Sequence, residues 1–343
     1  MIRNKNDLSR DISTVKGCLD LGSSYFRLLL AETPETGEKP APRPVFEDNL
    51  YIGWGEDIAG HGMVREESLA RAVGLFRSIL DQSAAHGCPR PAIVGTGTFR
   101  KARNRDEILS RLGEVSSLPV RILSSRGEAA YSFRGAASRL PADKRVMLID
   151  LGGTSTELSA GRGGVIDDCI DIGFGTHHLA LPHRMKGSRL LIRSIRRRFL
   201  SSGGGRIFSG SGIDPGAFDQ ESGGNGLVLL TGGTAVTLGM IDDLSRGLAP
   251  DPGRDSRMDT NLLETLFRRL MELPAMRWPR LLPVTPRRAN LLPAGIVLLK
   301  FILEWLNINM FTVTARDLRW GIILSGGEVA GRYIFDEQKS ADS

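Results

Sequence analysis

The chain has 343 residues, of which 41% are hydrophobic and 24% are charged. This length allows two domains of ordinary size, and the composition excludes a disordered or fibrous protein. The net charge of +6 is compatible with several polyanionic partners, namely nucleotides, polyphosphate, nucleic acid or anionic lipid.

The cysteines and the apolar segments indicate a cytoplasmic protein. Three widely separated cysteines lack metal-binding spacing, so neither a zinc site nor a disulfide framework is predicted. The N-terminal MIRNKNDLSRD has no apolar core of a secretion signal. The apolar stretch 294–311 is interrupted by Lys300 and Glu304, which predicts an amphipathic core helix. We therefore expect no membrane partner.

The first half of the chain alternates strand and helix patterns. Residues 17–32, GCLDLGSSYFRLLLAE, predict a strand, a glycine turn and a second strand, and a proline-rich link follows over 32–46. Residues 65–87 have the 3.6-residue period of a helix. A strand, a Gly/Thr loop and a helix are predicted over 91–112, and a strand that enters a helix over 120–140.

The same pattern restarts after a predicted linker at 141–144. Residues 146–161, VMLIDLGGTSTELSAG, predict strand, glycine turn and strand again, and 226–239 predict a strand, a Gly-Gly-Thr turn and a helix. A helix is expected over 293–308, and the run 317–324, DLRWGIIL, is interpreted as strand-like. The alternation favours an α/β protein, and the restart predicts two similar halves facing one cleft.

Two segments fall outside this alternation. The Gly/Ser-rich piece 201–226 predicts mobile loops. The basic segment 188–200 predicts either a solvated helix face or a face that guides a long polyanion by its electric field. Its arginines at helical spacing are Arg189, Arg193, Arg196 and Arg197. Aromatic residues are sparse there and no nucleic-acid-binding motif is evident, so no nucleic-acid partner is expected.

Four glycine- and hydroxyl-rich turns each follow an apolar run. Each alone is typical of a plain hairpin, but four that converge on one cleft would form a phosphate cage. Glycine lets an anion approach the backbone N–H groups, and hydroxyls add donors. The turns are Gly22-Ser23-Ser24, Gly95-Thr96-Gly97-Thr98, Gly152-Gly153-Thr154-Ser155-Thr156 and Gly232-Gly233-Thr234.

Two of these turns begin with an aspartate at the end of the strand. Asp20 and Asp150 are therefore candidates to hold Mg²⁺, which takes one or two protein carboxylates together with phosphate oxygens and water. The alternative is that either aspartate only caps its turn.

The ordered set of motifs resembles the exopolyphosphatase/guanosine pentaphosphate phosphohydrolase family of the acetate and sugar kinase–Hsc70–actin superfamily. The resemblance covers roughly 16–330. It rests on DLGSSYFRL, TGTFRKARN, RGEAAYSFRG, DLGGTSTEL, TGGTAVTLG, LLPAGIVLL and DLRWGII. It implies an α/β fold with two actin-like (ribonuclease H-like) lobes around a central cleft. We expect a tail over 1–15, a first lobe over 16–141 and a second over 142–343, whose C-terminal segment is free to pack back on the first.

The resemblance also implies a reaction, namely hydrolysis of a terminal phosphoanhydride of polyphosphate or pppGpp with Mg²⁺ or Mn²⁺. The turns after Asp20 and Asp150 would bind phosphate from opposite lobes. Arg100 would contact the substrate phosphates, Asp150 with Glu157 would hold the metal, and Glu128 would be the general base. These parts suit phosphoryl transfer, which needs positioning and positive charge. A homodimer is left open.

Departures from the family pattern keep two other functions open. Gly127 replaces the first of two adjacent glutamates, which suggests a polyphosphate- or ppGpp-binding protein that has lost catalysis. The duplicated turns also fit an ATP-dependent kinase of the same superfamily. Thr154 stands where a third glycine is common. His177 and His178 replace an expected arginine; we interpret them as a solvated pair, with assistance in phosphate binding as the alternative.

Overall fold

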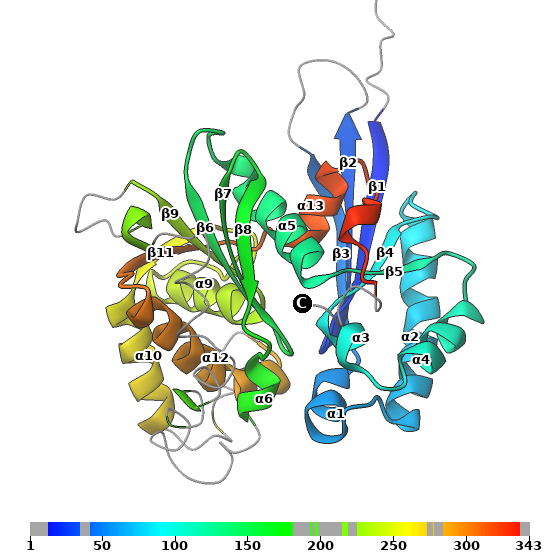
Figure 1. Ribbon diagram of the computed structural model, residues 1–343, viewed down its shortest axis with the longest axis horizontal. Coiled ribbons are helices and arrows are strands. Elements are labelled where there is room, and N and C mark those ends of the chain that lie inside the picture. Colours follow the sequence, from blue (N-terminus) through cyan, green and yellow to red (C-terminus); the bar gives the residue numbers. More distant parts are fainter. Residues whose placement is uncertain are drawn as a thin grey trace, which may run out of the picture.

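Two β-sheets stand side by side, with helices on their outer faces and between them (Figure 1). The structure is a computed structural model. It describes residues 13–34, 42–180, 193, 196–197, 215–218, 225–272, 277 and 284–336. None of the helices in this part of the chain combines the length and the hydropathy that a membrane span needs.

The first sheet has the strand order β3-β2-β1-β4-β5 among the described residues. Its strands are β1 (Ser13–Leu21), β2 (Tyr25–Pro34), β3 (Arg43–Tyr51), β4 (Ala92–Gly95) and β5 (Val120–Ile122). The helices of this half are α1 (Trp54–His61), α2 (Glu66–Ala85), α3 (Gly97–Lys101) and α4 (Arg105–Gly113). Helix α2 buries Leu69, Ala72, Phe76 and Ile79, whose spacing of three and four residues places them on one face.

The second sheet has the strand order β10-β11-β9-β6-β7-β8 among the described residues. Its strands are β6 (Val146–Leu151), β7 (Thr156–Arg162), β8 (Val165–Asp171), β9 (Leu227–Thr231), β10 (Ser256–Asp259) and β11 (Met310–Val313). Its helices are α6 (Thr176–Ala180), α9 (Gly233–Ser245), α10 (Thr260–Glu272) and α12 (Pro286–Trp305). Short 3₁₀ turns lie at η1 (Ala137–Arg139), η3 (Pro215–Phe218) and η5 (Gly331–Tyr333).

Both halves follow one plan, which confirms the two similar α/β halves predicted from the sequence. In each, three antiparallel strands (β1–β3 and β6–β8) are followed by two parallel ones, β4 and β5 in the first half and β9 and β11 in the second. Each glycine turn that follows an aspartate therefore joins the first two strands of its sheet.

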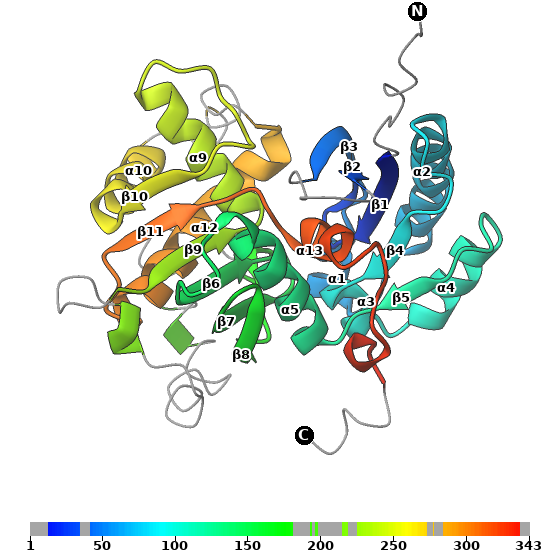
Figure 2. The ribbon, with the colours of Figure 1, turned by 90° about the horizontal axis from the view of Figure 1, so that it is seen from above.

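Two helices lie between the sheets, as both ribbon views show (Figures 1 and 2). They are α5 (Ser125–Ala136) and α13 (Leu318–Leu324). They can approach closely because each has a glycine at the contact. A side chain at Gly135 would overlap the Asp317 carbonyl, and one at Gly321 would overlap that of Tyr131. Beyond α13, the Phe335 N–H donates to Ile122 O at 2.8 Å, so the C-terminal segment returns to the first sheet.

Two local predictions are wrong. The run 317–324 is not a strand: Asp317 caps helix α13 by accepting from the Arg319 N–H at 3.0 Å, and packing between the sheets favours the helix. The link 32–46 is shorter than expected, since β2 continues to Pro34 and β3 begins at Arg43. Strand β3 is an edge strand, where proline is tolerated.

Other predictions fall wholly or partly outside the described residues. Within the basic segment 188–200 only Arg193, Arg196 and Arg197 are described, and they are helical and exposed. The Gly/Ser-rich piece 201–226 is described only at 215–218 and 225–226. The division into lobes at residue 141 stays a prediction; a turn lies there, in which the Lys144 N–H donates to Pro141 O at 3.1 Å.

Candidate active site

A pocket lies between the two halves of the protein. It encloses about 1050 Å³, part of which is open to solvent. Glu128, Asp150 and Arg27 line it together with every residue predicted to bind phosphate. Those residues are Gly22, Ser23, Ser24, Thr96, Gly152, Gly153, Thr154, Ser155, Gly232, Gly233 and Thr234. The structure thus brings the four glycine turns together in one cavity.

The first turn, Gly22–Ser24, is held by the start of α1. The Gly55 N–H donates to Ser23 O at 2.7 Å, and the Ile52 N–H donates to Ser24 O at 2.9 Å. With these two carbonyls engaged, the turn is fixed relative to the first sheet, and both of its serines line the pocket.

The second turn, Gly152–Ser155, is held by the start of α6. The Thr176 N–H donates to Gly152 O at 3.1 Å, and the His177 N–H donates to Gly153 O at 2.9 Å. Helix α6 therefore fixes the turn through backbone hydrogen bonds. Such bonds do not depend on the side chains at 176 and 177, so the sequence does not reveal them.

The two turns meet across the pocket. A Cβ atom at Gly153 would overlap Ser23 Oγ and lie 2.6 Å from His177 Cδ2, so this approach requires glycine. His177 Nε2 lies 2.7 Å from Ser24 Oγ and bridges the halves. Its side chain is buried, which corrects the expectation of a solvated histidine pair. Burial, aided by His178, lowers the pKa of His177 to about 4, so the ring is neutral at pH 7.

The third and fourth turns each open a helix. Thr96 precedes α3, and a Cβ atom at Gly97 would lie 3.0 Å from Ser155 Oγ, so α3 touches the second turn. Gly232 precedes α9 with a left-handed φ of 98°, and a Cβ atom there would lie 2.5 Å from Leu151 O. Gly232 is therefore required by its backbone conformation and by the close approach of Leu151 O, whereas Gly97 is in tight contact with side chains of the second turn.

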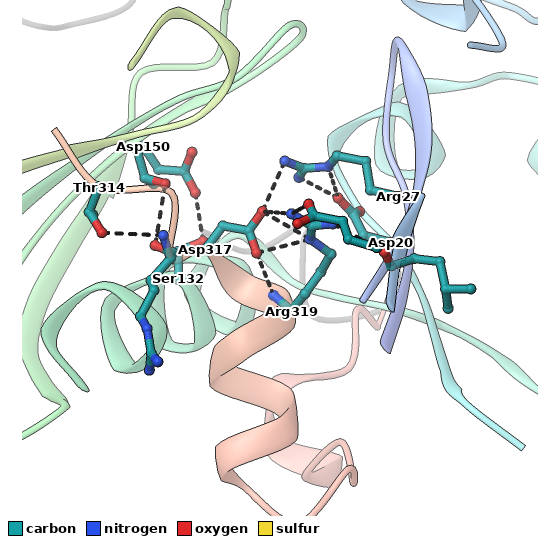
Figure 3. Close-up of polar contacts among 11 residues, drawn as sticks. Asp20, Arg27, Ser132, Asp150, Thr314, Asp317 and Arg319 are labelled. Carbon is teal, nitrogen blue, oxygen red and sulfur yellow. Dashed lines mark hydrogen bonds and ion pairs between the residues drawn. The ribbon is translucent and has the colours of Figure 1, made fainter. Parts of the chain in front are cut away.

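The two similar hairpins differ in one cross-strand pair. Asp20 lies opposite Arg27 in β1–β2, and Asp150 lies opposite Glu157 in β6–β7. Arg27 Nε donates to Asp20 Oδ2 at 2.9 Å and Nη1 to Asp317 Oδ2 at 3.0 Å (Figure 3). The first hairpin thus neutralises its aspartate, whereas the second places two carboxylates side by side.

The second hairpin holds two adjacent carboxyl groups with little compensating positive charge. The nearest cation to Glu157 Oε1 within the described residues is Arg100 Nη2 at 3.5 Å, and neither atom has a hydrogen-bond partner among them. Burial, and then the nearby Glu128, Asp171 and Asp150, raise the pKa of Glu157 well above its ordinary range. Asp150 accepts a hydrogen bond from Ser132 Oγ at 2.6 Å, yet burial raises its pKa to about 7.

This raised pKa predicts a pH-dependent stability. The folded protein keeps a proton on Asp150 that the unfolded chain releases near pH 3.8, so the stabilisation is complete below pH 3.8 and lost as the pH rises through about 7. We expect the free energy of unfolding of metal-free protein to fall by a few kcal/mol between about pH 4 and 7. In Asp150→Asn the fall should be smaller, as measured by urea denaturation with EDTA.

Asp106→Asn is the matched control, because the Asp106 side chain is 93% exposed. Its pH dependence should follow that of the unmodified protein. Parallel curves for the protein with and without Asp150→Asn would contradict the burial of this carboxyl group.

Arg100 and Glu128 form a pair behind the turns. Arg100 Nη1 donates to Glu128 Oε2 at 2.7 Å and to Leu123 O at 2.9 Å. Glu128 is 8% exposed, and burial raises its pKa although Arg100 opposes the shift. Among the described residues Glu128 lines the pocket and Arg100 does not, so the predicted contact of Arg100 with substrate phosphates stays a prediction.

Gly127 faces away from this pair. A Cβ atom at Gly127 would lie 2.5 Å from Tyr333 O, in the C-terminal segment that packs against α5. A side chain at this position would therefore point at Tyr333, whereas that of Glu128 reaches the pocket. The glycine is explained by the close approach of the C-terminal segment.

Sequence reasoning missed the residues at the mouth of the pocket. Arg287 lies over the Tyr51 ring at 3.9 Å and Arg288 over the Tyr25 ring at 5.4 Å, and all four line the pocket. Tyr25 Oη lies 3.1 Å from Thr285 Oγ1, the residue that caps α12. Arginines at a helix start are common at the surface, so only the arrangement in space reveals them.

The predicted metal ligands are only partly suited to one ion. The described residues contain no group of three or more His, Cys, Asp or Glu side chains placed to share a metal. Asp20 Oδ2 is taken by Arg27, although Oδ1 has no hydrogen-bond partner among the described residues. Asp150 and Glu157, paired across β6–β7, fit the one or two carboxylates that Mg²⁺ takes beside phosphate and water.

The chain is similar to known proteins in sequence. A family model described as the Ppx/GppA phosphatase family matches residues 37–191. A guanosine-5'-triphosphate,3'-diphosphate pyrophosphatase of Vibrio cholerae is 24% identical over 314 residues, which are 91% of this chain and 59% of the relative. The chain thus spans about three fifths of the length of that relative.

The chain is also similar to solved structures. A Ppx/GppA family member from Aquifex aeolicus is 19% identical with a TM-score of 0.71, over 92% of this chain and 98% of that one. An exopolyphosphatase from Cytophaga hutchinsonii is 18% identical with a TM-score of 0.77, over 93% and 100%. At these identities the likeness shows the fold, which is the two-lobed, actin-like α/β fold.

Proposed function

We propose that the chain belongs to the Ppx/GppA phosphatase family, whose model matches residues 37–191, and that it hydrolyses the terminal phosphoanhydride bond of polyphosphate or of pppGpp. One observation carries this proposal: four separate glycine turns line a single pocket that also contains the carboxylates of Glu128 and Asp150. Amide and hydroxyl donors from both lobes suit a chain of phosphates, and carboxylates suit a metal ion and a general base.

The proposed reaction is an in-line displacement by water. Glu128 accepts a proton from the water as its oxygen bonds to the terminal phosphorus, and the bond from that phosphorus to the bridging oxygen breaks. The products are inorganic phosphate and a chain shorter by one phosphate. Arg100, which donates to Glu128 Oε2, holds this carboxylate in place and favours its ionised form.

A divalent ion, Mg²⁺ or Mn²⁺, is part of the proposal. Asp150 and Glu157 would hold it, and when bound it would neutralise negative charge on the phosphate oxygens. The pair suits this role because the two residues face each other across β6–β7, Asp150 lines the pocket, and the buried Glu157 Oε1 has no hydrogen-bond partner among the described residues. Ser132 orients Asp150 by donating to its Oδ2.

A phosphate-release assay with polyphosphate, pppGpp and ATP, in Mg²⁺ or Mn²⁺ and in EDTA, tests the proposal. We expect metal-dependent release of phosphate from polyphosphate or pppGpp. Tight binding of polyphosphate without release would instead support a binding protein that has lost catalysis. Tight binding of ATP with transfer to a small acceptor would support a kinase, and either result would overturn the proposed hydrolysis.

A further inference from the structure

Lys101, at the end of α3, reaches from the first half of the protein to the phosphate turn of the second. Its Nζ donates to Thr154 O and, at 3.0 Å, to Gly173 O. Gly173 precedes α6, so the ammonium group lies beside the loop whose backbone already holds the Gly152–Ser155 turn. Lys101 was not singled out by any sequence pattern.

Lys101 completes a set of three engaged carbonyls in this turn. Gly152 O and Gly153 O accept from the N–H groups of Thr176 and His177, and Thr154 O accepts from Lys101. All three donors come from the 173–177 loop or from the lysine that binds it. The three carbonyls are therefore drawn toward the same loop.

The planarity of the peptide bond fixes the consequence for the N–H groups. In a trans peptide the C=O and N–H point in opposite directions. Carbonyls drawn toward 173–177 therefore turn the N–H groups of Gly153, Thr154 and Ser155 away from that loop. None of these three donates to another group within the described residues, and all three residues line the pocket. Successive N–H groups of this kind form an anion-binding concavity.

The first half contributes to this cradle at two points of α3. Besides Lys101, Gly97 packs so closely that a Cβ atom there would lie 3.0 Å from Ser155 Oγ and 3.1 Å from Thr154 Oγ1. The third peptide of the cradle is thus held by a side chain from the opposite lobe, whereas the first two are held by α6 of the same lobe.

We propose that Lys101 is a positioning residue that completes the anion cradle of the second lobe from the first lobe. The Ser155 N–H then points into the pocket only while the two lobes are closed on each other. Anion binding and lobe closure are in this way linked through one side chain. The inference rests on the proposed function in that the anion is taken to be a phosphate chain.

Lys101→Met tests the inference in the full chain, with tripolyphosphate as the probe and EDTA present so that no turnover occurs. We expect calorimetry to show binding about tenfold weaker than in the unmodified protein, because one charge-assisted hydrogen bond that holds the cradle is lost. Lys101→Arg keeps donors for both carbonyls and should retain most of the affinity. Lys300→Met, on the ion-paired surface of α12, is the control and should bind normally.

A second readout does not depend on the ligand. Without its third anchor the turn should loosen, so the amides of residues 172–180 should exchange hydrogen faster in Lys101→Met than in the unmodified protein. If tripolyphosphate binds both proteins equally well, the inference is wrong although the proposed function stands. If it binds neither, the proposed function fails, and the exchange rates alone decide: faster exchange supports the role of Lys101 and unchanged exchange overturns it.

Discussion

Replacement of Glu128 by glutamine is expected to reduce phosphate release by about 10²- to 10⁴-fold, the usual contribution of a general base. Glutamine has nearly the same shape and keeps an oxygen that accepts from Arg100, so the fold and the pocket should persist. What is lost is the ability to take a proton from the attacking water. The measurement is phosphate release from polyphosphate and pppGpp at saturating substrate.

Binding separates this explanation from a general loss of structure. Because Glu128→Gln removes negative charge from a pocket for polyanions, tripolyphosphate should bind at least as tightly as before. Glu114→Gln is the control, since Glu114 is an exposed residue at the end of α4 whose side chain lies 3.8 Å from Arg111. Wild-type turnover in Glu128→Gln would mean that Glu128 is not the base and that the proposed mechanism is wrong.

The adjacent Gly127 does not weaken this expectation. In the sequence it suggests a lost glutamate and a lost activity. In the structure a side chain at 127 would meet Tyr333 O, so the position faces the C-terminal segment and not the pocket. Only long-range packing reveals this, because Tyr333 is more than two hundred residues away in the chain.

The parts of the site that sequence alone predicted are those with a local signature. A glycine and hydroxyl turn after an apolar strand, repeated four times, is enough to predict a large part of the lining of one pocket. The aspartates that precede two of these turns follow from strand ends in the same way. Such features depend on neighbouring residues and on the alternation of strands and helices, which a sequence contains directly.

The parts that sequence could not predict depend on contacts between distant segments. The run DLRWGIIL is apolar enough for a strand, but Asp317 caps it and the space between the sheets accommodates it as α13. In the sequence His177 is typical of a loop histidine. In the structure Gly55 and Gly153, which lack a Cβ atom, make room for its ring. Lys101 is typical of a surface cation in the sequence, and only the fold brings it to the carbonyls of Thr154 and Gly173.

The difference between the hairpins leads to a second large effect, this time on stability. Replacement of Arg27 by methionine is expected to lower the free energy of unfolding by about 3 kcal/mol, since it leaves a buried charge without its partner. The side chain of Asp20 is 1% exposed, and Arg27 donates to its Oδ2 through two nitrogens. Asp317 retains its ion pair with Arg319, so Asp20 is the carboxylate that loses its partner. Urea denaturation near pH 7 measures the change.

Two further variants show whether the unpaired Asp20 carboxylate causes the loss of stability in Arg27→Met. In Asp20→Asn with Arg27→Met the unpaired charge is gone, so part of the lost stability should return; if the double variant is no more stable than the single one, the charge is not the cause.

Glu157→Gln changes the position in the other hairpin that corresponds to Arg27. Its raised pKa means that the fold already favours the protonated form, which glutamine imitates, so metal-free stability should not fall. The first hairpin therefore needs its charged cross-strand partner to fold stably, whereas the second holds two carboxyl groups whose raised pKa values favour protonation until a cation binds.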